Sequence, residues 1–400
     1  MSDPITLIHL VSGQNMPNIL PFISLGPTKI IHVVSTKQGF GRQSKVIDNA
    51  LEVVCKLLAL HEGIPHSFES EIVELGEPSP SIENTKSKIS DVIKLSEHPI
   101  INYTGGTKHM GIGAYLAAKE AGIPSFYCDT PRNFISGDTA PINFPRTLGE
   151  VAQLVNVEII LAAQGLIRDK HWESKGYDSN RAKLCRIGFN FSQSEPEAFR
   201  KFRSEIRQHL RRGNNVNSDD LDRALSNPIP ESNGFITYLQ AAEACELLEK
   251  RVEGYFPKIT KSSAGDRKKQ LNGILMNLDG VAFEGYVFEQ FPRSLRFTDM
   301  LYSVKPTGDS LEGDFGETDF LAYEPKNVGL SLISCKSSMP DLEHMESILT
   351  RKNRFGGLFT QGILCVEAPD PDPKIKERLK RLDIELVNGA EIEEKFQIKH

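Results

Sequence analysis

The sequence has few cysteines, no long apolar run and no large excess of charge of one sign. Its six cysteines are dispersed singly along 400 residues, which argues against a zinc knuckle or a disulfide framework. The longest apolar stretches have the length of a β-strand and are broken by Gly, Pro or charged residues, so we expect no membrane partner. The first residues lack the basic start and cleavage site of a signal peptide. These absences predict a cytoplasmic protein.

The net charge of −6 is small and negative, which argues against a protein that coats nucleic acid by bulk electrostatics. Residues 266–400 form the most acidic segment, with 18 basic and 23 acidic residues. Such a segment would handle phosphate groups only through bound cations or local basic patches, for example at Arg351, Lys352 and Arg354. The chain is 39% apolar and 25% charged, a composition that supports ordinary cores, and its length predicts two or three domains.

Strands alternate with helical patterns in residues 1–140. β-branched apolar runs at 5–11 and 29–35 predict two strands, and runs at 99–103 and 123–129 predict two more on either side of a helix. This alternation is typical of βαβ units. We therefore predict an α/β fold that starts with a Rossmann-like domain containing a parallel sheet.

The remaining chain shows two other patterns. Residues 141–265 combine helical periodicity with charge and predict a helical middle segment. One of its helices carries an arginine stripe that suits a solvated face, phosphate steering or a dimer contact: Arg200, Arg203, Arg207 and Arg211. Residues 266–400 mix helices and strands and predict a mixed α/β domain. Within it, ETDFLAYE and LSLISCKSS, separated by PKNVG, predict a hairpin.

The motif NYTGGTK, residues 102–108, stands where a predicted strand turns into a helix. Adjacent glycines let backbone amides approach an anion, and the helix N-terminus adds N–H groups and the positive end of its dipole. Thr104, Thr107 and Lys108 supply side-chain donors. The spacing differs from that of a P-loop or GxGxxG, so neither ATP nor NAD is expected. The motif predicts a phosphate cradle; a turn required only by strand-to-helix geometry is the alternative.

The loop after the first strand is a second candidate for ligand binding. Ser12, Gly13, Gln14 and Asn18 lie there, and this loop should open at the same carboxyl edge of the sheet as the glycine turn. Loop-capping roles for Ser12 and Asn18 explain these residues as well as ligand contact does. Thr36, at the end of the second strand, is a further candidate.

Acidic residues and a lysine occupy the predicted hairpin. Strand alternation puts Glu317 and Asp319 on one face, and one pairing register places Asp319 opposite Lys336. Glu284, from the preceding helix, could add another oxygen. Such oxygens suit Mg²⁺ or Mn²⁺, and a nearby ammonium group can position a water and stabilise charge on a phosphoryl oxygen. An ordinary Asp/Lys ion pair on a solvated sheet face is the alternative.

Together these motifs resemble a known family. LVSGQNMPN and NYTGGTKHM resemble the ligand-binding motifs of CRISPR-associated Rossmann-fold (CARF) sensor domains. FEGYVFEQF, ETDFLAY, LISCKSS and RFGG resemble the PD-(D/E)xK nuclease module that is fused to such sensors in type III CRISPR ancillary nucleases. The two matches span residues 5–140 and 270–365, and their order in one chain is more specific than either motif alone. No motif covers the middle.

The resemblance implies a CARF-like sensor (1–140), a helical linker region (141–265) and a restriction-endonuclease-like PD-(D/E)xK domain (266–400). It implies a homodimer that binds a cyclic oligoadenylate, expected to be cyclic tetra-adenylate, and thereby activates cleavage of RNA or DNA. The implied nuclease site is Glu284, Glu317, Asp319 and Lys336, with the three carboxylates as ligands of Mg²⁺ or Mn²⁺. Ser334 departs from the nuclease pattern, because a carboxylate often stands there. The implied ligand contacts, with Thr36 added from its position, are Ser12, Gly13, Gln14, Asn18, Thr36, Asn102, Thr104, Gly105, Gly106, Thr107 and Lys108.

Two other functions are compatible with the sequence. A cyclic-oligoadenylate-responsive CARF transcription regulator would bind DNA through its middle helices and would have no nuclease activity. No convincing helix-turn-helix is present, however, and this function leaves the acidic residues and lysine of the hairpin without a role. Alternatively, the sensor domain could itself slowly cut its cyclic ligand.

Overall fold

The computed structural model divides the chain into two compact units. The first comprises Met1–Glu173, Arg296–Leu332 and Ile348–Gly362, and the second comprises Ser174–Leu295, Ile333–Ser347 and Ile363–His400. The expected division into three consecutive domains stays a prediction. The structure describes residues 4–62, 66–130, 134–137, 139–142, 144–168, 179–210, 218–229, 234–279, 282–307, 316–337, 340–355, 360–367 and 372–399.

The first unit contains a six-stranded sheet with the order β3-β2-β1-β4-β5-β6. Each neighbouring pair is parallel except β5 and β6, which are antiparallel. The expected Rossmann-like α/β architecture is therefore confirmed for the N-terminal domain. Its strands are β1 (Thr6–Leu10), β2 (Lys29–Val34), β3 (Glu69–Glu74), β4 (Pro99–Asn102), β5 (Ser125–Asp129) and β6 (Phe134–Gly137).

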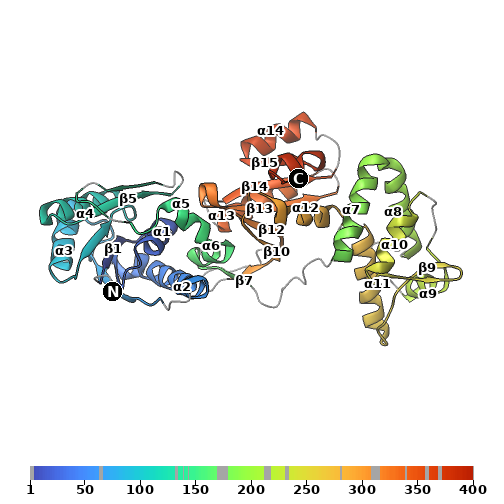
Figure 1. The fold of residues 1–400 in the computed structure, drawn as a ribbon, viewed down its shortest axis with the longest axis horizontal. Coiled ribbons are helices and arrows are strands. Elements are labelled where there is room, and N and C mark those ends of the chain that lie inside the picture. Colours follow the sequence, from blue (N-terminus) through green and yellow to red (C-terminus); the bar gives the residue numbers. More distant parts are fainter. Residues whose placement is uncertain are drawn as a thin grey trace. The chain divides into compact units, whose positions relative to one another are not determined.

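Helices cover both faces of this sheet. Figure 1 shows α3 and α4 on one side and α1 and α2 on the other. Ile8 and Leu10 of β1 pack in one core with Ile89 of α3 and Ala114 of α4, because alternate residues of a strand face the same layer. Chain order runs outward from β1 in one direction through β2 and in the other through β4, so the switch in strand order falls between β1 and β4. The helices are α1 (Met16–Leu25), α2 (Lys37–Glu62), α3 (Ile82–Lys94) and α4 (Lys108–Ala121).

Short elements of the first unit join the N-terminal domain to strands from the C-terminal part of the chain. The backbone N–H of Val157 donates to Asp299 Oδ2 at 2.8 Å, and the Tyr323 hydroxyl donates to the carbonyl of Ala152 at 2.8 Å. β7 and β11 pair antiparallel. The elements concerned are α5 (Leu148–Leu154), α6 (Val157–Ala163), β7 (Ile167–Arg168), β10 (Asp299–Val304), β11 (Pro306–Thr307) and β12 (Thr318–Glu324).

The second unit contains a helical core. Phe199, Phe202 and Ile206, which the sequence places on one apolar stripe, are all buried in it beside Phe235 and Tyr238. Aromatic rings pack against one another in this core, with ring centroids of Phe202 and Phe235 4.8 Å apart. The elements are α7 (Ser179–Ser194), α8 (Pro196–Leu210), α9 (Ser218–Ser226), α10 (Ile236–Ala244), β8 (Leu248–Arg251), β9 (Gly254–Pro257), α11 (Ala264–Asp279) and α12 (Ala282–Gln290).

A five-stranded sheet has the order β10-β12-β13-β14-β15. The two strands expected to form a hairpin, β12 and β13, are neighbours in it and are joined through the short η4 helix (Pro325–Asn327). Within the described ranges, no helix combines the length and apolarity needed to cross a membrane. The remaining elements are η3 (Phe291–Arg293), β13 (Gly329–Lys336), α13 (Leu342–Phe355), β14 (Thr360–Val366), α14 (Pro373–Arg381), β15 (Ile384–Asn388), η6 (Gly389–Glu391) and α15 (Ile392–Lys395).

Candidate functional site

The glycine turn after β4 lies directly against the end of β1. A Cβ on Gly105 would stand 2.1 Å from the carbonyl oxygen of Leu10 and 3.6 Å from Ser12 Oγ, and Gly106 has a φ of +73°. Only glycine allows this approach and this backbone conformation without strain. The turn therefore has the geometric role that the sequence offered as an alternative. The same geometry brings the Ser12 loop beside the predicted phosphate cradle.

Helix α4 begins at the cradle. Thr107 is its N-cap, with the side-chain oxygen accepting from the N–H of Met110 at 3.3 Å, and Lys108 is its exposed first residue. The first N–H groups of a helix have no intrahelical acceptor, and the helix dipole makes this end positive. The start of α4 therefore offers positive charge and donors at the carboxyl edge of β4.

A buried amide network connects the two loops. Asn102 Nδ2 donates to Asn18 Oδ1 at 3.0 Å and to the carbonyl of Pro17 at 2.8 Å. Asn102 Oδ1 accepts from both the N–H and the hydroxyl of Thr104, and Thr104 Oγ1 also accepts from the N–H of Cys128. These bonds use both donors and both acceptor positions of Asn102. The side chain of Asn102 thus shapes the loops, and its direct contact with a ligand stays a prediction.

The other candidate ligand residues differ in their exposure at this edge. Gln14 and Lys108 are exposed, whereas Asn18 and Gly105 are buried. Ser12 Oγ lies 3.2 Å from the Gln14 carbonyl and 3.3 Å from its N–H, as in a loop-capping turn. The surface that a ligand can reach therefore includes the exposed residues Gly13, Gln14, Thr107 and Lys108, with the half-buried residues Ser12, Thr36, Thr104 and Gly106 beside them.

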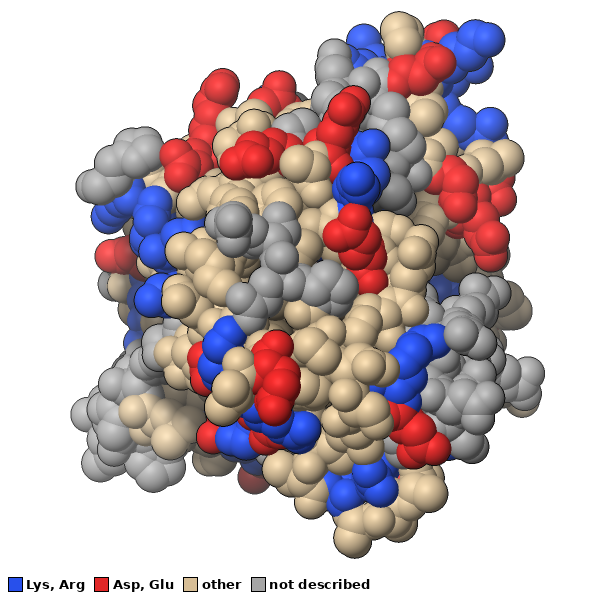
Figure 2. All heavy atoms as spheres, turned by 90° about the vertical axis from the view of Figure 1, so that its right-hand side faces the viewer, with Lys and Arg blue, Asp and Glu red and all other residues tan. Residues whose placement is uncertain are grey.

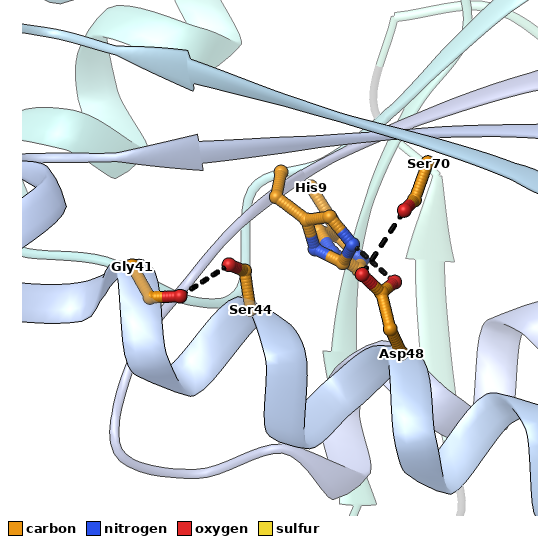
Figure 3. Close-up of polar contacts among 6 residues, drawn as sticks. His9, Gly41, Ser44, Asp48 and Ser70 are labelled. Atoms are coloured by element: carbon orange, nitrogen blue, oxygen red, sulfur yellow. Dashed lines mark hydrogen bonds and ion pairs between the residues drawn. The ribbon is translucent and has the colours of Figure 1, made fainter.

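Sequence reasoning missed a polar chain beneath α2, which Figure 3 shows and which is buried at His9 and His32. His9 Nε2 lies 2.6 Å from His32 Nδ1, and His32 Nε2 lies 2.7 Å from Asp48 Oδ1. The Ser70 hydroxyl donates to Asp48 Oδ2 at 3.0 Å. The Asp48 carboxylate can only accept a hydrogen bond, so His32 Nε2 donates to it. The Nδ1 atom of a neutral His32 then accepts a hydrogen bond from His9. Burial first, and then the neighbouring His32, hold the pKa of His9 well below its usual value.

Two predicted nuclease carboxylates lie on β12 and just before it. Glu317 is exposed and Asp319 is half-buried. Arg351 of α13 donates to the carbonyl oxygen of Glu317 and to Thr318 Oγ1, and the Ser303 hydroxyl donates to the Glu317 carboxylate. Burial lowers the pKa of the Arg351 guanidinium, while the charges of Asp319 and Glu317 oppose that shift. The sequence indicated Arg351 only as part of a local basic patch, whereas the structure places it beside the two acids.

Lys336 is the last residue of β13. Its carbonyl accepts from the N–H of Glu367 at 2.9 Å, and Glu367 directly follows β14, so the two strands end at the same sheet edge. The buried Glu367 carboxylate lies 3.9 Å from the Arg203 guanidinium. Burial raises the pKa of Glu367, while hydrogen bonding to Ser192 and the charge of Arg203 oppose the shift. Arg203 therefore belongs to a buried ion pair and not to a solvated stripe.

The remaining predicted residues are Glu284 and the other arginines of the stripe. Arg200 is exposed, whereas Arg211 and the side chain of Arg207 lie outside the described residues. Glu284 is half-buried on α12. The ring of Tyr286 on the same helix stacks on Phe189 of α7 with centroids 3.7 Å apart. Helix α7, which also carries Ser192, thus packs against the helix that bears Glu284 and contacts the end of β14.

The donors fit a divalent cation in type but do not form a complete site. Glu317 and Asp319 offer the carboxylate oxygens that Mg²⁺ and Mn²⁺ prefer. Over the described part of the chain, however, no three His, Cys, Asp or Glu side chains come together to form a metal site. A ligand set that includes Glu284, Glu317 and Asp319 stays a prediction.

The strand order and loop positions define the class of the N-terminal domain: a doubly wound α/β domain with candidate ligand loops at the switch point between β1 and β4. Residues 6–139 match the family model described as the Card1 CARF domain. The N-terminal domain is therefore a CARF domain. No curated protein sequence is significantly similar to the chain.

Solved structures share the fold over nearly the whole chain. Can2 from Sulfobacillus thermosulfidooxidans, in complex with cyclic tetra-adenylate, is 15% identical, with 98% of each chain covered and a TM-score of 0.66. The protein VC1899 from Vibrio cholerae is 13% identical, with 98% of this chain and 96% of that chain covered and a TM-score of 0.65. A type III CRISPR defence DNA nuclease activated by cyclic oligoadenylate is 14% identical, with 95% of this chain and 52% of that chain covered and a TM-score of 0.50. At these identities the similarity establishes the fold.

Proposed function

We propose that the protein is a metal-dependent nuclease of type III CRISPR defence, activated by a cyclic oligoadenylate that binds the CARF domain. The observation that carries the proposal is the pairing of the Ser12 loop with the glycine turn at the switch point between β1 and β4. Two further findings support it. The matched family is a CARF domain, and a structure with the same fold over 98% of both chains was solved with cyclic tetra-adenylate.

The exposed residues at this edge suit a nucleotide with several phosphates. Lys108 and the N-terminal N–H groups of α4 would attract a phosphate, and Gln14 offers both a donor and an acceptor to an adenine or ribose. A ring of four phosphates has enough symmetry to span two such edges related by a twofold axis. We therefore propose a cytoplasmic homodimer that binds one cyclic tetra-adenylate, which would favour one arrangement of the dimer.

The catalytic groups are proposed from the C-terminal part of the chain. Glu317 and Asp319, with Glu284, would hold Mg²⁺ or Mn²⁺, which when bound would supply an activated water and charge stabilisation. Lys336 would position the attacking water and stabilise negative charge on the phosphodiester. Arg351, beside both β12 carboxylates, would balance their charge and bind a substrate phosphate.

A cleavage assay tests this function. Labelled single-stranded RNA, single-stranded DNA and plasmid are incubated with the full chain, with and without cyclic tetra-adenylate and Mn²⁺, and rings of other sizes are compared. We expect cleavage only when both the ring and the metal are present. Messenger binding without cleavage of any substrate, together with ring-dependent binding of duplex DNA, would support the transcription regulator instead. Loss of the ring itself would indicate that the CARF domain degrades its ligand.

A further inference from the structure

Helix α4 exposes an apolar stripe that starts beside the predicted phosphate cradle. Ile112 is 46% exposed and Leu116 is 37% exposed. Both follow Lys108 at intervals of four residues, so the three side chains share one face of the helix. Met110 and Ala114, which lie toward the core, are buried. A surface helix usually turns polar residues to solvent, whereas α4 is apolar on two faces and the chain itself buries only one of them.

Tyrosines extend this stripe to the neighbouring strand. The rings of Tyr115 on α4 and Tyr127 on β5 both contact the ring of Tyr103, with centroids 5.7 Å and 6.1 Å from it. Tyr127 is 44% exposed, and the other two tyrosines are half-buried. Tyrosine combines a large apolar area with a polar tip and is enriched at protein–protein interfaces. We call these three tyrosines, together with Ile112 and Leu116, the α4 patch.

Other exposed surfaces have a different character. Figure 2 shows a face on which Lys and Arg side chains lie among those of Asp and Glu. Five more large apolar side chains are exposed in the described part of the chain, each on a different element or connection: Leu60, Leu95, Val252, Leu295 and Leu342. Apolar side chains that are exposed singly are normal, whereas a contiguous group of them marks an interaction site. The α4 patch is such a group.

The position of the patch beside the cradle indicates what covers it. One chain offers one Lys108 and one α4 N-terminus at this edge, whereas a cyclic tetra-adenylate carries four phosphates, and a second copy of the chain doubles both. A twofold axis perpendicular to α4 would separate the two N-termini by about 20 Å and aim them in opposite directions. An axis that runs along α4 instead brings both N-termini to one ring and lets the two α4 patches face each other.

We propose that two copies of the chain meet through their α4 patches, on a twofold axis that runs along α4, so that two Lys108 cradles share one ring. The inference rests on the proposed function and names the surface by which its homodimer forms. A twofold contact uses the same patch in both copies and must therefore be complementary to itself. An apolar and aromatic patch meets this requirement, because its burial gains free energy whichever apolar surface faces it.

This arrangement couples the contact to the messenger. Without a ligand, two lysines and two positive helix ends repel each other across the axis. An anionic ring between them replaces this repulsion with attraction. The ring therefore strengthens the contact, and by linkage the contact strengthens the binding of the ring by the same factor.

Sedimentation velocity of the full chain, over a series of concentrations with and without cyclic tetra-adenylate, measures the association. The variant is Ile112→Glu with Leu116→Glu, which puts charge into the patch and leaves the cradle intact. The control is Leu60→Glu with Leu95→Glu. It replaces two side chains of the same unit that are 81% and 87% exposed, and it changes the net charge equally. Far-UV circular dichroism verifies that each variant is folded.

Cross-linking tests the patch independently of any contact elsewhere in the chain. Leu116→Cys and, as its control, Leu95→Cys are treated with a short bismaleimide and analysed on a denaturing gel. The wild type gives the background from the half-buried native thiols Cys245 and Cys335. This measurement also decides the outcome if the glutamate variant fails to fold or is held together by a second contact.

We expect the wild type to form a dimer whose dissociation constant falls by roughly tenfold when the ring is added. The glutamate variant of the patch should raise this constant by roughly 100-fold, because like charges would face each other in the contact. The Leu60 and Leu95 control should associate like the wild type. The Leu116→Cys variant should give a cross-linked dimer above the background, and the Leu95→Cys variant should not.

Two outcomes would overturn the inference. A Leu116→Cys variant that cross-links no more than the Leu95→Cys variant would show that the patches do not meet. Equal weakening in the glutamate variant and its control would show an effect of net charge alone. The failure of the proposed function looks different. A chain that dimerises through the patch but binds no ring would contradict that function, whereas a chain that binds the ring as a monomer would contradict only the interface.

Discussion

Asn102 Nδ2 donates a hydrogen bond to Asn18 Oδ1 across 3.0 Å and so joins the loops that follow β1 and β4. Asn102→Ala leaves Asn18 Oδ1, the carbonyl of Pro17 and the N–H of Thr104 without this partner. We expect the free energy of unfolding to fall by about 2–4 kcal/mol. Urea-induced unfolding of both single variants and of the double variant Asn18→Ala, Asn102→Ala measures the coupling, expected to be about 1 kcal/mol. Strictly additive effects would show that the shared bond contributes nothing.

Glycine is required at position 105 and not at position 13. Gly105→Ala would force a Cβ against the backbone of Leu10, at 2.1 Å from its carbonyl oxygen, whereas a Cβ on Gly13 meets nothing within 4 Å. We expect Gly105→Ala to lower the free energy of unfolding of the CARF domain by about 1–3 kcal/mol. Gly13→Ala should leave it unchanged. Thermal unfolding monitored by circular dichroism compares the two. Equal melting temperatures would contradict the close packing of the turn on β1.

Lys108 should contribute directly to messenger affinity. It is exposed at the start of α4, where its charge and the helix dipole act together on an anion. We expect Lys108→Ala to weaken binding of cyclic tetra-adenylate by roughly tenfold. Isothermal titration calorimetry measures this. Lys119→Ala, at the other end of the same helix, is the control and should bind like the wild type. Equal affinities for all three proteins would exclude Lys108 from the binding surface.

The proposed nuclease groups should separate from the binding groups. Asp319→Ala and Lys336→Ala should each abolish cleavage, because one removes a proposed metal ligand and the other the proposed water-positioning ammonium group. Both variants should bind cyclic tetra-adenylate with wild-type affinity. Lys326→Ala, in the turn between β12 and β13, serves as the control and should cleave normally. Loss of messenger binding in the Asp319 or Lys336 variant would contradict this division of roles.

His9 should make the stability of the CARF domain dependent on pH. Its pKa is lowered in the folded chain, mainly by burial. As the pH falls below about 6.5, the unfolded chain binds a proton that the folded chain does not. The free energy of unfolding should therefore be highest above this pH and should decrease below it, by at most about 1.4 kcal/mol per pH unit for this one group.

Urea unfolding between pH 8 and pH 5 tests this dependence. His9→Gln, which keeps a side-chain donor toward His32, should flatten the pH profile. His109→Gln changes an exposed histidine of α4 and should leave the profile as in the wild type. A profile of the same steepness in His9→Gln would show that other groups cause the dependence.

The sequence predicted the parts of the CARF domain that have strong local signals. β1, β2 and β4 are apolar and β-branched, and α4 begins and ends with clear capping residues. α1 escaped prediction because its ten residues contain Pro21 in the helix interior, where a proline usually argues against a helix. The edge strand β3, with the sequence ESEIVE, is too polar for the apolar pattern. The burial of α1 and the pairing of β3 with β2 override these local preferences.

The site could be predicted only where its residues are close in sequence or share a sheet edge. The Ser12 loop and the glycine turn met as expected, because parallel strands bring their carboxyl ends together. The bonds between His9 and His32, and between Asp48 and Ser70, come from different elements that no periodicity links. The burial of Arg203 against Glu367 likewise depends on tertiary packing. The sequence alone shows the arginine stripe, but it does not show that Glu367 pairs with Arg203.

Helix α6 is anchored at both ends to different parts of the first unit. At its C-terminus, Asn15 Nδ2 donates to the carbonyl of Ala163 at 2.6 Å, immediately after the Ser12 loop. At its N-terminus, the N–H of Val157 donates to Asp299 on β10, which pairs with the strand that carries Asp319. Seven helical residues act as a strut about 10 Å long. If the Ser12 loop moved by even one ångström, one of these two hydrogen bonds would have to break, or the movement would be passed on to the paired strands β10 and β12.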